Sequence, residues 1–467
     1  MEKNKKRKIH MPSAYSILFL IIVAVCAITW FLPTVKNATI SNMVMAAPSG
    51  FVDAIDVAIF VLVLGGFLGV IAKSGALDNG IAAMVDKLKG KEMLLIPLLM
   101  LLFSLGGTTY GMAEETIAFY ALIVTTMMAA GFDAMVGVSV ILLGSGVGVI
   151  GSTVNPFAIS AAVDALKASN PNLYVNHTII MILGAILWIA SLVPAILFVL
   201  HYAKKVKNSG RSILSPKELA ASQNAFGEEE KGDIVFTRRM KWVLAIFGFS
   251  FGVMVISLIP WENFGVTIFR NTSFLTGTNL GEWYFKELQA WFLIMAIIVG
   301  YVAGLGEGKT VEAFVGGAGD MVGVALVIAV SRGISVIMAE TGLGDYILAL
   351  ASTGLANVSP IVFSVAAYGI YLGLSFLIPS TSGLAAASMP TFGGLTANLG
   401  LSPEVMILIF SAACGLVNLI TPTSAVVMGG LSISKIEWFT WAKFIGKFLG
   451  ILLILNLVIL CIAMVVL

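Results

Sequence analysis

The chain has 467 residues, of which 59% are hydrophobic and only 11% are charged, and its net charge is +2. Soluble globular proteins carry roughly 25% charged residues, so this composition excludes an ordinary soluble protein. The basic residues cluster at the ends of apolar segments, and we therefore expect no nucleic-acid partner. Apolar runs such as 14–33 and 451–467 predict an all-α polytopic membrane protein.

The first apolar run, 14–33, is predicted to be an uncleaved membrane span because no soluble chain follows it. Cytoplasmic loops of membrane proteins carry an excess of Lys and Arg. The basic residues between positions 3 and 8 therefore predict a cytoplasmic N-terminus, and the Lys/Arg-rich stretch 203–241 is predicted to be a central cytoplasmic linker. The loop 261–287 has few basic residues, which predicts an external loop.

Three short segments of the first half have counterparts in the second half. GVIAKSGALDNGI (69–81) resembles SVIMAETGLGDYI (335–347), GGTTYG (106–111) corresponds to PSTSG (379–383), and GSTVNP (151–156) corresponds to ITPTSA (420–425). The separations stay between about 266 and 272 residues, which predicts a duplicated block of about 150 residues. We expect an N-terminal half, 1–235, and a C-terminal half, 236–467.

The basic clusters predict that the two blocks have opposite orientations. Lys87, Lys89 and Lys91 follow helix 51–73, whereas the lysines beside the last helix, 438–467, lie at its start. These positions are compatible with one topology if each block contains a re-entrant hairpin. The predicted topology is therefore an inverted repeat with nine full crossings, two re-entrant hairpins and an external C-terminus.

The two hairpins are expected to reach the middle of the membrane from opposite sides. Segment 92–130 is predicted to enter and leave on the cytoplasmic side, with its tip near 107–110. Segment 359–401 is predicted to do the same from outside, with its tip near 379–383. Non-helical backbone at that depth is tolerated only where protein or a water-filled cavity surrounds it. We therefore expect both tips to border a substrate site.

Helices 134–168 and 404–432 are interrupted by Gly, Pro, Ser and Thr, which predicts two broken helices that meet the hairpin tips. The candidate substrate-binding residues at these tips and breaks carry hydroxyl or amide groups and are Thr108, Thr109, Ser152, Thr153, Asn155, Ser380, Thr381, Ser382, Thr421, Thr423 and Ser424. One interpretation is that they satisfy backbone groups freed by the breaks. The other, favoured by their recurrence at four related places, is that they bind a carboxylate together with helix N-termini.

Glu114 and Glu115 follow the first tip in an otherwise apolar stretch, and the second hairpin has GLAAAS at the equivalent place. A charge at the membrane centre costs about 2.5–3.5 kcal/mol on insertion scales. One explanation is a structural ion pair with Arg332, which could equally pair with Glu340. The explanation we favour is a cationic ligand. Adjacent helical residues point about 100° apart, so we expect only one of the two carboxylates to face the cavity.

Nucleotide-binding patterns occur in two places without their usual context. AGLGEGKT (303–310) and GVGVIG (146–151) lie among apolar membrane segments, whereas genuine phosphate-binding loops follow a strand in a soluble domain. No HExxH pattern occurs in the sequence. Cys26, Cys414 and Cys461 lie inside apolar runs, so we expect buried packing and no disulfide, metal site or cofactor. We therefore do not expect an enzyme.

Three motifs make the chain similar to the ion transporter superfamily, and within it to the group of anaerobic C4-dicarboxylate carriers and basic amino-acid (arginine/ornithine) antiporters. They are GGTTYGMAEET (106–116), SFLIPSTSGLAAASMP (375–390) and ITPTSAVVMGG (420–430). The resemblance implies homodimers that work by an elevator motion, and tip motifs that contact substrate or ions. The usual Ser-Asn-Thr tip is replaced by Gly-Thr-Thr at 107–109 and Ser-Thr-Ser at 380–382, which argues against Na⁺ coupling.

We expect a secondary active transporter of the cell membrane that exchanges arginine for ornithine. Two carboxylates beside the first tip fit a cationic amino acid better than a dianion, and exchange of two monocations needs no coupling ion. The alternative is a Na⁺- or H⁺-coupled carboxylate transporter resembling the C4-dicarboxylate carriers. A sensor or assembly scaffold that binds a ligand without moving it has no positive support in the sequence. The expected partners are the small-molecule substrate, membrane lipid and a second copy in a homodimer.

Overall fold

The computed structural model describes residues 14–77, 79–80, 91–170, 173–227, 237–259, 261–355 and 358–467. Within these ranges the chain is helical and has no strand, which confirms the all-α prediction. The basic residues of the N-terminal segment, Lys87 and Lys89, and part of the predicted linker lie outside the described residues.

The helices of the N-terminal part are α1 (Ala14–Thr29), α2 (Ile40–Asp53), α3 (Ile55–Lys73), η1 (Glu92–Leu94), α5 (Leu95–Tyr110), η2 (Glu114–Phe119), α6 (Tyr120–Ala129), α7 (Ala134–Ile150), η3 (Pro156–Ser160), α8 (Ala161–Ser169), α9 (His177–Ser209) and α10 (Pro216–Phe226). Those of the C-terminal part are α11 (Arg238–Leu258), η4 (Trp261–Phe264), α12 (Phe285–Ala303), α13 (Glu307–Asp320), α14 (Val322–Thr341), α15 (Leu343–Leu355), α16 (Pro360–Leu377), α17 (Thr381–Asn398), α18 (Pro403–Val417), α19 (Ala425–Ile433) and α20 (Trp438–Val466).

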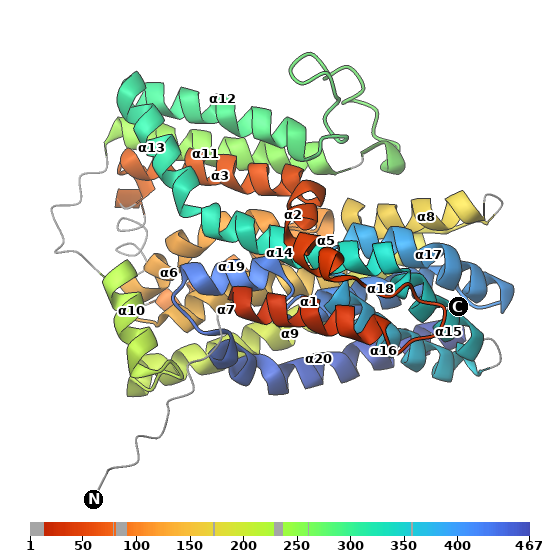
Figure 1. The fold of residues 1–467 in the computed structure, drawn as a ribbon. Helices are drawn as coiled ribbons and strands as arrows, with labels where there is room; N and C mark the ends of the chain where they lie inside the picture. The colour runs from red at the N-terminus through yellow and green to blue at the C-terminus, as the bar shows by residue number, and fades with distance from the viewer. Residues whose placement is uncertain are drawn as a thin grey trace, which may run out of the picture.

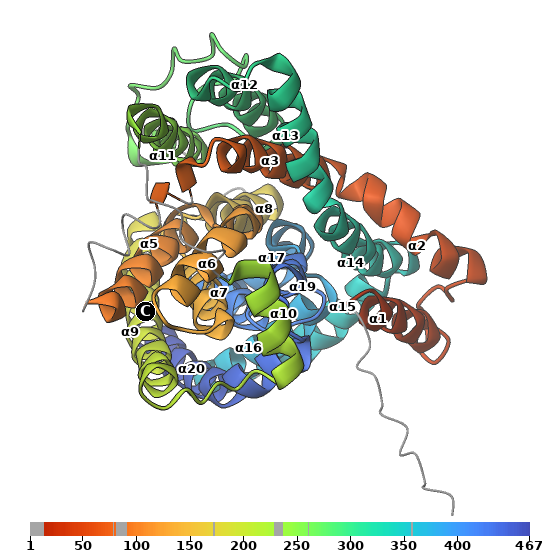
Figure 2. The ribbon, with the colours of Figure 1, turned by 90° about the vertical axis from the view of Figure 1, so that its left-hand side faces the viewer.

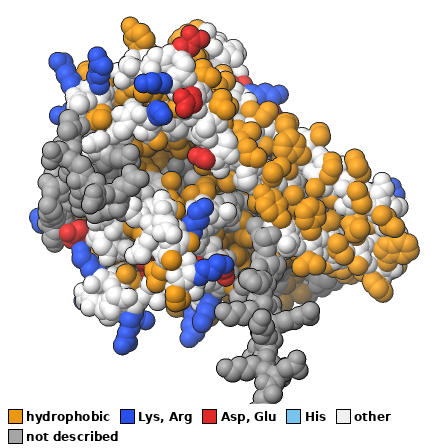
Figure 3. Space-filling view, turned by 60° about the vertical axis from the view of Figure 1, so that its left-hand side comes forward, with side chains coloured by type: hydrophobic (Ala, Val, Ile, Leu, Met, Phe, Trp, Pro, Cys, Tyr) orange, Lys and Arg blue, Asp and Glu red, His pale blue; other side chains and the backbone are white. Residues whose placement is uncertain are grey.

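Eight of the described helices are long and apolar enough to cross a membrane. Their outward side chains are apolar as well: Ile182 and Leu197 on α9 and Ile454 on α20 are each about 60% exposed. Figure 3 shows hydrophobic side chains over much of one face, with most of its Lys and Arg side chains in the left half of the view. The chain is therefore a multi-pass membrane protein. The predicted count of nine crossings and the sidedness of the termini stay predictions.

The helices fall into two regions, which Figures 1 and 2 show from the side and along the helix axes. The central bundle consists of α5–α9 and α16–α20, and the outer arch consists of α1–α3 and α11–α14. Helices from both halves of the chain contact each other inside the bundle, where α7 packs on α18 and α9 packs on α20. The boundary between the halves at 235/236 stays a prediction.

The order of elements in the bundle recurs along the chain. A hairpin (α5 with α6, α16 with α17) is followed by a broken helix (α7 with α8, α18 with α19) and a long helix (α9, α20). Each hairpin packs on the first segment of its own broken helix, and α8 packs on α17 while α19 packs on η2 and α6. This recurrence supports a duplicated block, and the opposite orientation of the two blocks stays a prediction.

The hairpin tips differ in position from the prediction. Residues 107–110 belong to α5, and the first turn lies at 111–113, where Gly111 has a φ of +78° that favours glycine. The second turn lies at 378–380, and Thr381 already begins α17. The predicted helix 51–73 is also divided, because α2 ends at Asp53 and α3 begins at Ile55. The interruptions predicted in 134–168 and 404–432 are confirmed.

A close helix crossing holds the first hairpin against the broken helix behind it. A Cβ added to Gly107 on α5 would meet the backbone oxygen of Ser145 on α7, and one added to Gly148 would meet that of Ser104. Small residues at helix contacts allow the two backbones to approach closely in membranes. The glycines that looked like helix breakers in the sequence are packing contacts here.

Candidate substrate site

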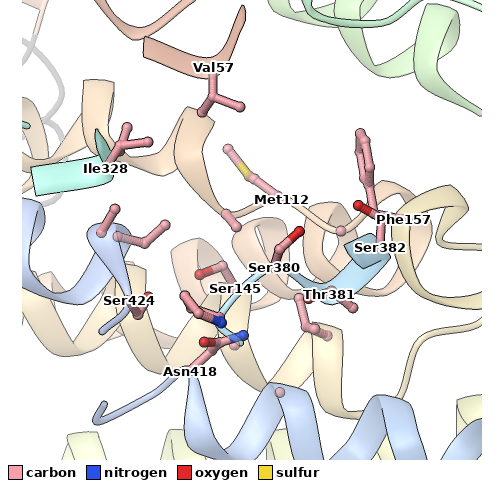
Figure 4. Close-up of a pocket in the computed structure, with 18 of the residues that line it drawn as sticks. Val57, Met112, Ser145, Phe157, Ile328, Ser380, Thr381, Ser382, Asn418 and Ser424 are labelled. Carbon is pink, nitrogen blue, oxygen red and sulfur yellow. The ribbon is translucent and has the colours of Figure 1, made fainter. Parts of the chain in front are cut away.

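A cavity lies where the hairpin turns and the broken helices meet (Figure 4). Its described lining is mixed polar and apolar and includes Val57, Gly111, Met112, Ala113, Ser145, Asn155, Phe157, Tyr284, Phe285, Ile328, Ser331, Arg332, Pro379, Ser380, Thr381, Ser382, Asn418, Thr423 and Ser424. These residues come from both hairpins, both broken helices, and α3, α12 and α14 of the arch. The cavity therefore lies between the bundle and the arch.

Three described helices begin at this cavity: η3, α17 and α19. Ser380 caps α17 by accepting a hydrogen bond from the N–H of Gly383 at 3.2 Å. Asn155 Oδ1 accepts from the N–H groups of Phe157 and Ala158, at 2.9 and 3.2 Å. A helix N-terminus carries a partial positive charge, so three that converge favour a negatively charged ligand group.

Arg332 brings a full positive charge to the same place. Its side chain is 24% exposed and lines the cavity from α14. Its Nε lies 3.5 Å from Oδ2 of Asp53, the last residue of α2, whose side chain is half exposed. Among the described residues that line the cavity, Arg332 is the one with a formal charge. Its observed partner is therefore Asp53, whereas Glu340 accepts a hydrogen bond from Asn42.

Asn418 places a side-chain amide at the cavity. It follows the last residue of α18, and Figure 4 shows its side chain beside Ser145 and Thr381. Asn418 Oδ1 is buried and has no hydrogen-bond partner among the described residues. A buried oxygen without a partner costs about 1–3 kcal/mol. A donor on a bound ligand would remove that cost.

Aromatic rings form one wall of the cavity. The ring centroids of Phe157 and Tyr284 lie 5.3 Å apart, and those of Tyr284 and Phe285 lie 4.8 Å apart. Phe157 belongs to η3 in the bundle, whereas the other two come from the start of α12 in the arch. The faces of such rings attract cations, guanidinium groups in particular.

The structure brings six of the predicted site residues together at the cavity. They are Asn155, Ser380, Thr381, Ser382, Thr423 and Ser424. Thr423 also donates its hydroxyl to the carbonyl of Phe376 at 2.7 Å, which ties the second broken helix to the second hairpin. Thr423 is thus a lining residue of the cavity that also has a structural role.

The other Ser and Thr candidates have local structural roles. Thr108 donates to the carbonyl of Gly151 at 2.6 Å, and Thr153 donates to the carbonyl of Thr108 at 3.0 Å. Ser152 donates to the carbonyl of Val149. The two bonds of Thr108 fasten the end of α5 to the break after α7, and the bond of Ser152 stays within the end of α7, as expected where helix breaks free backbone groups.

Two further candidates also lie off the described cavity lining. Thr109 donates to the carbonyl of Leu105 and faces an apolar cleft on the other side of the hairpin. Thr421 is buried and shares a hydrogen bond of 2.7 Å with Thr423, which does line the cavity. The structure thus places Thr421 behind a lining residue.

Glu114 and Glu115 begin η2, directly after the cavity-lining Ala113. Their side chains lie outside what the structure describes. The described backbone therefore places the start of the acidic pair next to the cavity wall. Whether either carboxylate reaches a ligand stays a prediction.

Sequence reasoning did not assign Arg332, Ser145, Asn418 or the aromatic wall to the site. Arg332 was noted only as a possible partner of acidic residues. A signal was present for it and for Ser145, because a charged or polar residue inside an apolar span is a functional candidate. Tyr284 and Phe285 had no such signal, because aromatic residues at a helix start are also typical of the membrane interface.

The sequence of the chain is similar to those of known proteins. The family model for the C4-dicarboxylate anaerobic carrier, DcuC, matches residues 38–465. An uncharacterized protein of Haemophilus influenzae is 26% identical, with 98% of each chain covered. A protein of Escherichia coli K12 named "Putative basic amino acid antiporter YfcC" is 27% identical, over 89% of this chain and 78% of its own length.

Two solved structures also align with the chain. One is described as the Neisseria gonorrhoeae MtrF structure from a class of antimetabolite efflux pumps, at 16% identity and a TM-score of 0.46, over 98% and 96% of the two chains. The other is the Alcanivorax borkumensis YdaH transporter, also at 16% and 0.46, over 97% and 98%. The family assignment rests on the match over residues 38–465, which confirms the resemblance seen in the motifs: the chain belongs to the family of C4-dicarboxylate anaerobic carriers and is a membrane transport protein.

Proposed function

We propose that the chain is a secondary active transporter that exchanges arginine for ornithine, and that the cavity binds the amino acid at both ends. The observation that carries the proposal is the distribution of charge and hydrogen-bonding groups around the cavity. One part of the wall suits a carboxylate, and other parts suit cationic groups. The proposal also agrees with the name of the E. coli relative.

The carboxylate would lie between Arg332 and the start of α17. A guanidinium and the first N–H groups of a helix both donate to a carboxylate, and such charge-assisted bonds are roughly twice as strong as neutral ones. Ser380 and Thr381 add hydroxyl donors at the same turn. Arg332 would then exchange its contact with Asp53 for one with the substrate.

The cationic groups of the substrate would meet acceptors and aromatic faces. The α-ammonium group would donate to Asn418 Oδ1, which is buried and unpartnered among the described residues. The guanidinium of arginine or the side-chain ammonium of ornithine would lie near Phe157 and Tyr284. A carboxylate of Glu114 or Glu115 would complete the charge balance beside Ala113.

The mode of transport is part of the proposal. The cavity lies between the bundle and the arch, and an elevator motion would move the bundle, with its substrate, against the arch. We propose that the protein works as a homodimer in the cell membrane, with a cytoplasmic N-terminus and an external C-terminus. The recurring order of the bundle helices supports a repeat, and its inverted orientation, which such a mechanism uses, is part of the proposal.

Counterflow in reconstituted vesicles tests the exchange. Vesicles preloaded with unlabelled ornithine should accumulate labelled arginine without a Na⁺ or proton gradient. Empty vesicles should not accumulate it, and preloaded citrulline should support little uptake because its side chain is neutral. Arginine uptake that is equal with and without internal amino acid would contradict an antiporter.

A second candidate is a C4-dicarboxylate transporter coupled to Na⁺ or H⁺. It is favoured by the family model and by Arg332 being the one formal charge among the described lining residues. A dicarboxylate has no donor for Asn418 Oδ1, which is why the amino acid fits better. The same vesicle experiment with succinate or fumarate in place of the amino acids tests this candidate. Gradient-dependent succinate uptake, with no arginine counterflow, would establish the second candidate.

A further inference from the structure

A second and larger space in the molecule lies between the first hairpin and α11 of the arch. This apolar cleft has a volume of about 760 Å³. Leu99, Leu102 and Phe103 line it from α5, and Phe247 and Phe251 line it from α11. The ring pairs Phe103–Phe119 and Phe119–Phe251 connect its two walls, with centroids 5.6 and 4.8 Å apart.

Two threonines line the cleft, and the hydroxyl groups of both already donate hydrogen bonds to backbone carbonyls. Thr109 donates to the carbonyl of Leu105 at 2.6 Å, and Thr126 donates to that of Leu122 at 2.7 Å. An ordered water needs two to four polar partners, and apolar cavities of about 150 Å³ stay dry and bind small hydrocarbons. The apolar cleft is several times larger than that, and its lining favours a hydrocarbon chain over ordered water.

The cleft runs along most of α11, which is one of the candidate membrane spans. Its lining on this helix begins at Leu244 and continues to Met254 and Val255, with Ile259 just beyond the helix end. Fifteen residues of helix rise about 22 Å, which exceeds the roughly 15 Å depth of one leaflet of the hydrocarbon core. The cleft is thus long enough to hold one extended acyl chain.

Basic and aromatic residues mark one end of the cleft. Arg238, Arg239 and Lys241 are exposed on the first turn of α11, one turn before Leu244. Trp242 beside them is 57% exposed, as is typical of a residue at the membrane–water interface. Basic clusters at this position attract anionic lipid headgroups.

We propose that the apolar cleft is a binding site for one anionic phospholipid, with an acyl chain between α5 and α11 and the phosphate at Arg238, Arg239 and Lys241. Two glycines of α11 leave room for the acyl chain, because no atom lies within 4 Å of a Cβ built on Gly248 or Gly252. Met112 lines both this cleft and the polar cavity, so the bound chain touches the turn of the first hairpin. This site is independent of which substrate the polar cavity takes.

Filling the cleft from α11 tests the acyl-chain site. The full chain is purified in mild detergent and titrated with phosphatidylglycerol, and bound lipid is counted by native mass spectrometry. Gly248→Leu and Gly252→Leu should each reduce the tightly bound phospholipid at least fivefold. Gly450→Leu on α20 is the matched control, because Gly450 also has open space at its Cβ and is exposed on a membrane helix.

Removing the positive charges on the first turn of α11 tests the proposed position of the lipid phosphate. The triple change Arg238→Gln, Arg239→Gln and Lys241→Gln should reduce the preference for phosphatidylglycerol over phosphatidylcholine at least fivefold, whereas Lys443→Gln with Lys447→Gln on α20 should not. Lipid retention by the glycine variants equal to that of Gly450→Leu would overturn the proposal. So would a shift from dimer to monomer in those variants with unchanged bound lipid, because the occupant would then be a second copy of the chain. An unchanged headgroup preference in the triple variant would overturn the phosphate assignment.

Discussion

The two hairpins turn at the same cavity but present different chemistry to it. The first turn, 111–113, contributes backbone and the apolar side chains of Met112 and Ala113, and an acidic pair follows it. The second turn contributes Ser380, Thr381 and Ser382 at the start of α17 and has no acidic residue. Two hairpins at the same place in the recurring order of elements thus have unlike ends.

This difference fits a substrate that is itself unlike at its two ends. The hydroxyl groups and helix N-terminus of the second hairpin suit a carboxylate, and Arg332 approaches them: one of its guanidinium nitrogens lies 3.8 Å from a Cβ built on Gly383. The first hairpin would carry the charge that meets a cation. A symmetrical dianion would call for the same chemistry on both hairpins.

Removing a carboxylate from the first hairpin should have the largest effect. Leaving a buried cationic ligand group unpaired costs on the order of 3–5 kcal/mol. Glu114→Gln or Glu115→Gln should therefore weaken arginine binding by about two or more orders of magnitude, with much less effect on citrulline. Isothermal titration of both ligands with each purified variant measures this. If both variants bind arginine like the parent, the comparison between the hairpins fails.

Arg332→Gln should have the next largest effect, on the side of the second hairpin. Loss of hydrogen bonds to a charged group costs about 1.5–3 kcal/mol, which is roughly a 10- to 100-fold weaker affinity for arginine. Agmatine lacks the carboxylate, so its affinity should change little. Asp53→Asn is the control: it frees Arg332 from its pair, and arginine should bind no more weakly than in the parent. Equal losses for arginine and agmatine would mean that Arg332 does not meet the carboxylate.

Ser380→Ala should have a smaller effect. It removes one neutral hydroxyl donor to the ligand, about 1 kcal/mol, so arginine affinity should fall roughly two- to tenfold. It also removes the side-chain cap of α17, which should lower stability by about 1 kcal/mol. Ser380→Thr retains the hydroxyl and should restore most of the affinity. Thr109→Ala on the first hairpin is the matched control, because Thr109 is not among the described residues that line the cavity. This change should leave arginine affinity unchanged. The reverse order of effects would place the ligand at the first turn.

A change outside both hairpins should alter stability and leave binding unchanged. Glu218 on α10 is buried, which raises its pKa, but hydrogen bonds from Ser215 and from the N–H of Glu437 outweigh this and hold the pKa below its usual value. The stabilisation is therefore present at neutral pH and is lost as the pH falls through the lowered pKa.

Glu218→Gln should lower the unfolding temperature at pH 7 by an amount that corresponds to about 1 kcal/mol, and the difference from the parent should shrink in acid. Thermal unfolding as a function of pH measures this, with arginine affinity at pH 7 as the second readout. Lys217→Gln removes only an exposed ion pair of 3.6 Å and should cost less. A pH-independent difference would mean that the carboxylate charge is not responsible.

The sequence alone predicted the helical membrane class and the places where helices break. Apolar runs must be helical in a bilayer, because every backbone group needs an internal partner. Clusters of Gly, Pro, Ser and Thr at 151–156 and 420–425 cannot continue a helix cheaply, and the structure breaks α7–α8 and α18–α19 there. It also predicted that Ser380 and Ser424 belong to one cavity, because a hairpin tip and a broken helix that both reach the middle of the membrane are expected to meet there.

The tertiary structure decided which polar groups face the cavity and which hold the backbone together. Thr108 and Thr423 look alike in the sequence, and each donates to a backbone carbonyl, but of the two only Thr423 also lines the cavity. A hydroxyl serves either purpose, and the choice depends on which neighbour the packing brings within about 3 Å. Arg332, Asn418 and the wall of Phe157 and Tyr284 come from segments far apart in the chain, and only their packing makes them one site.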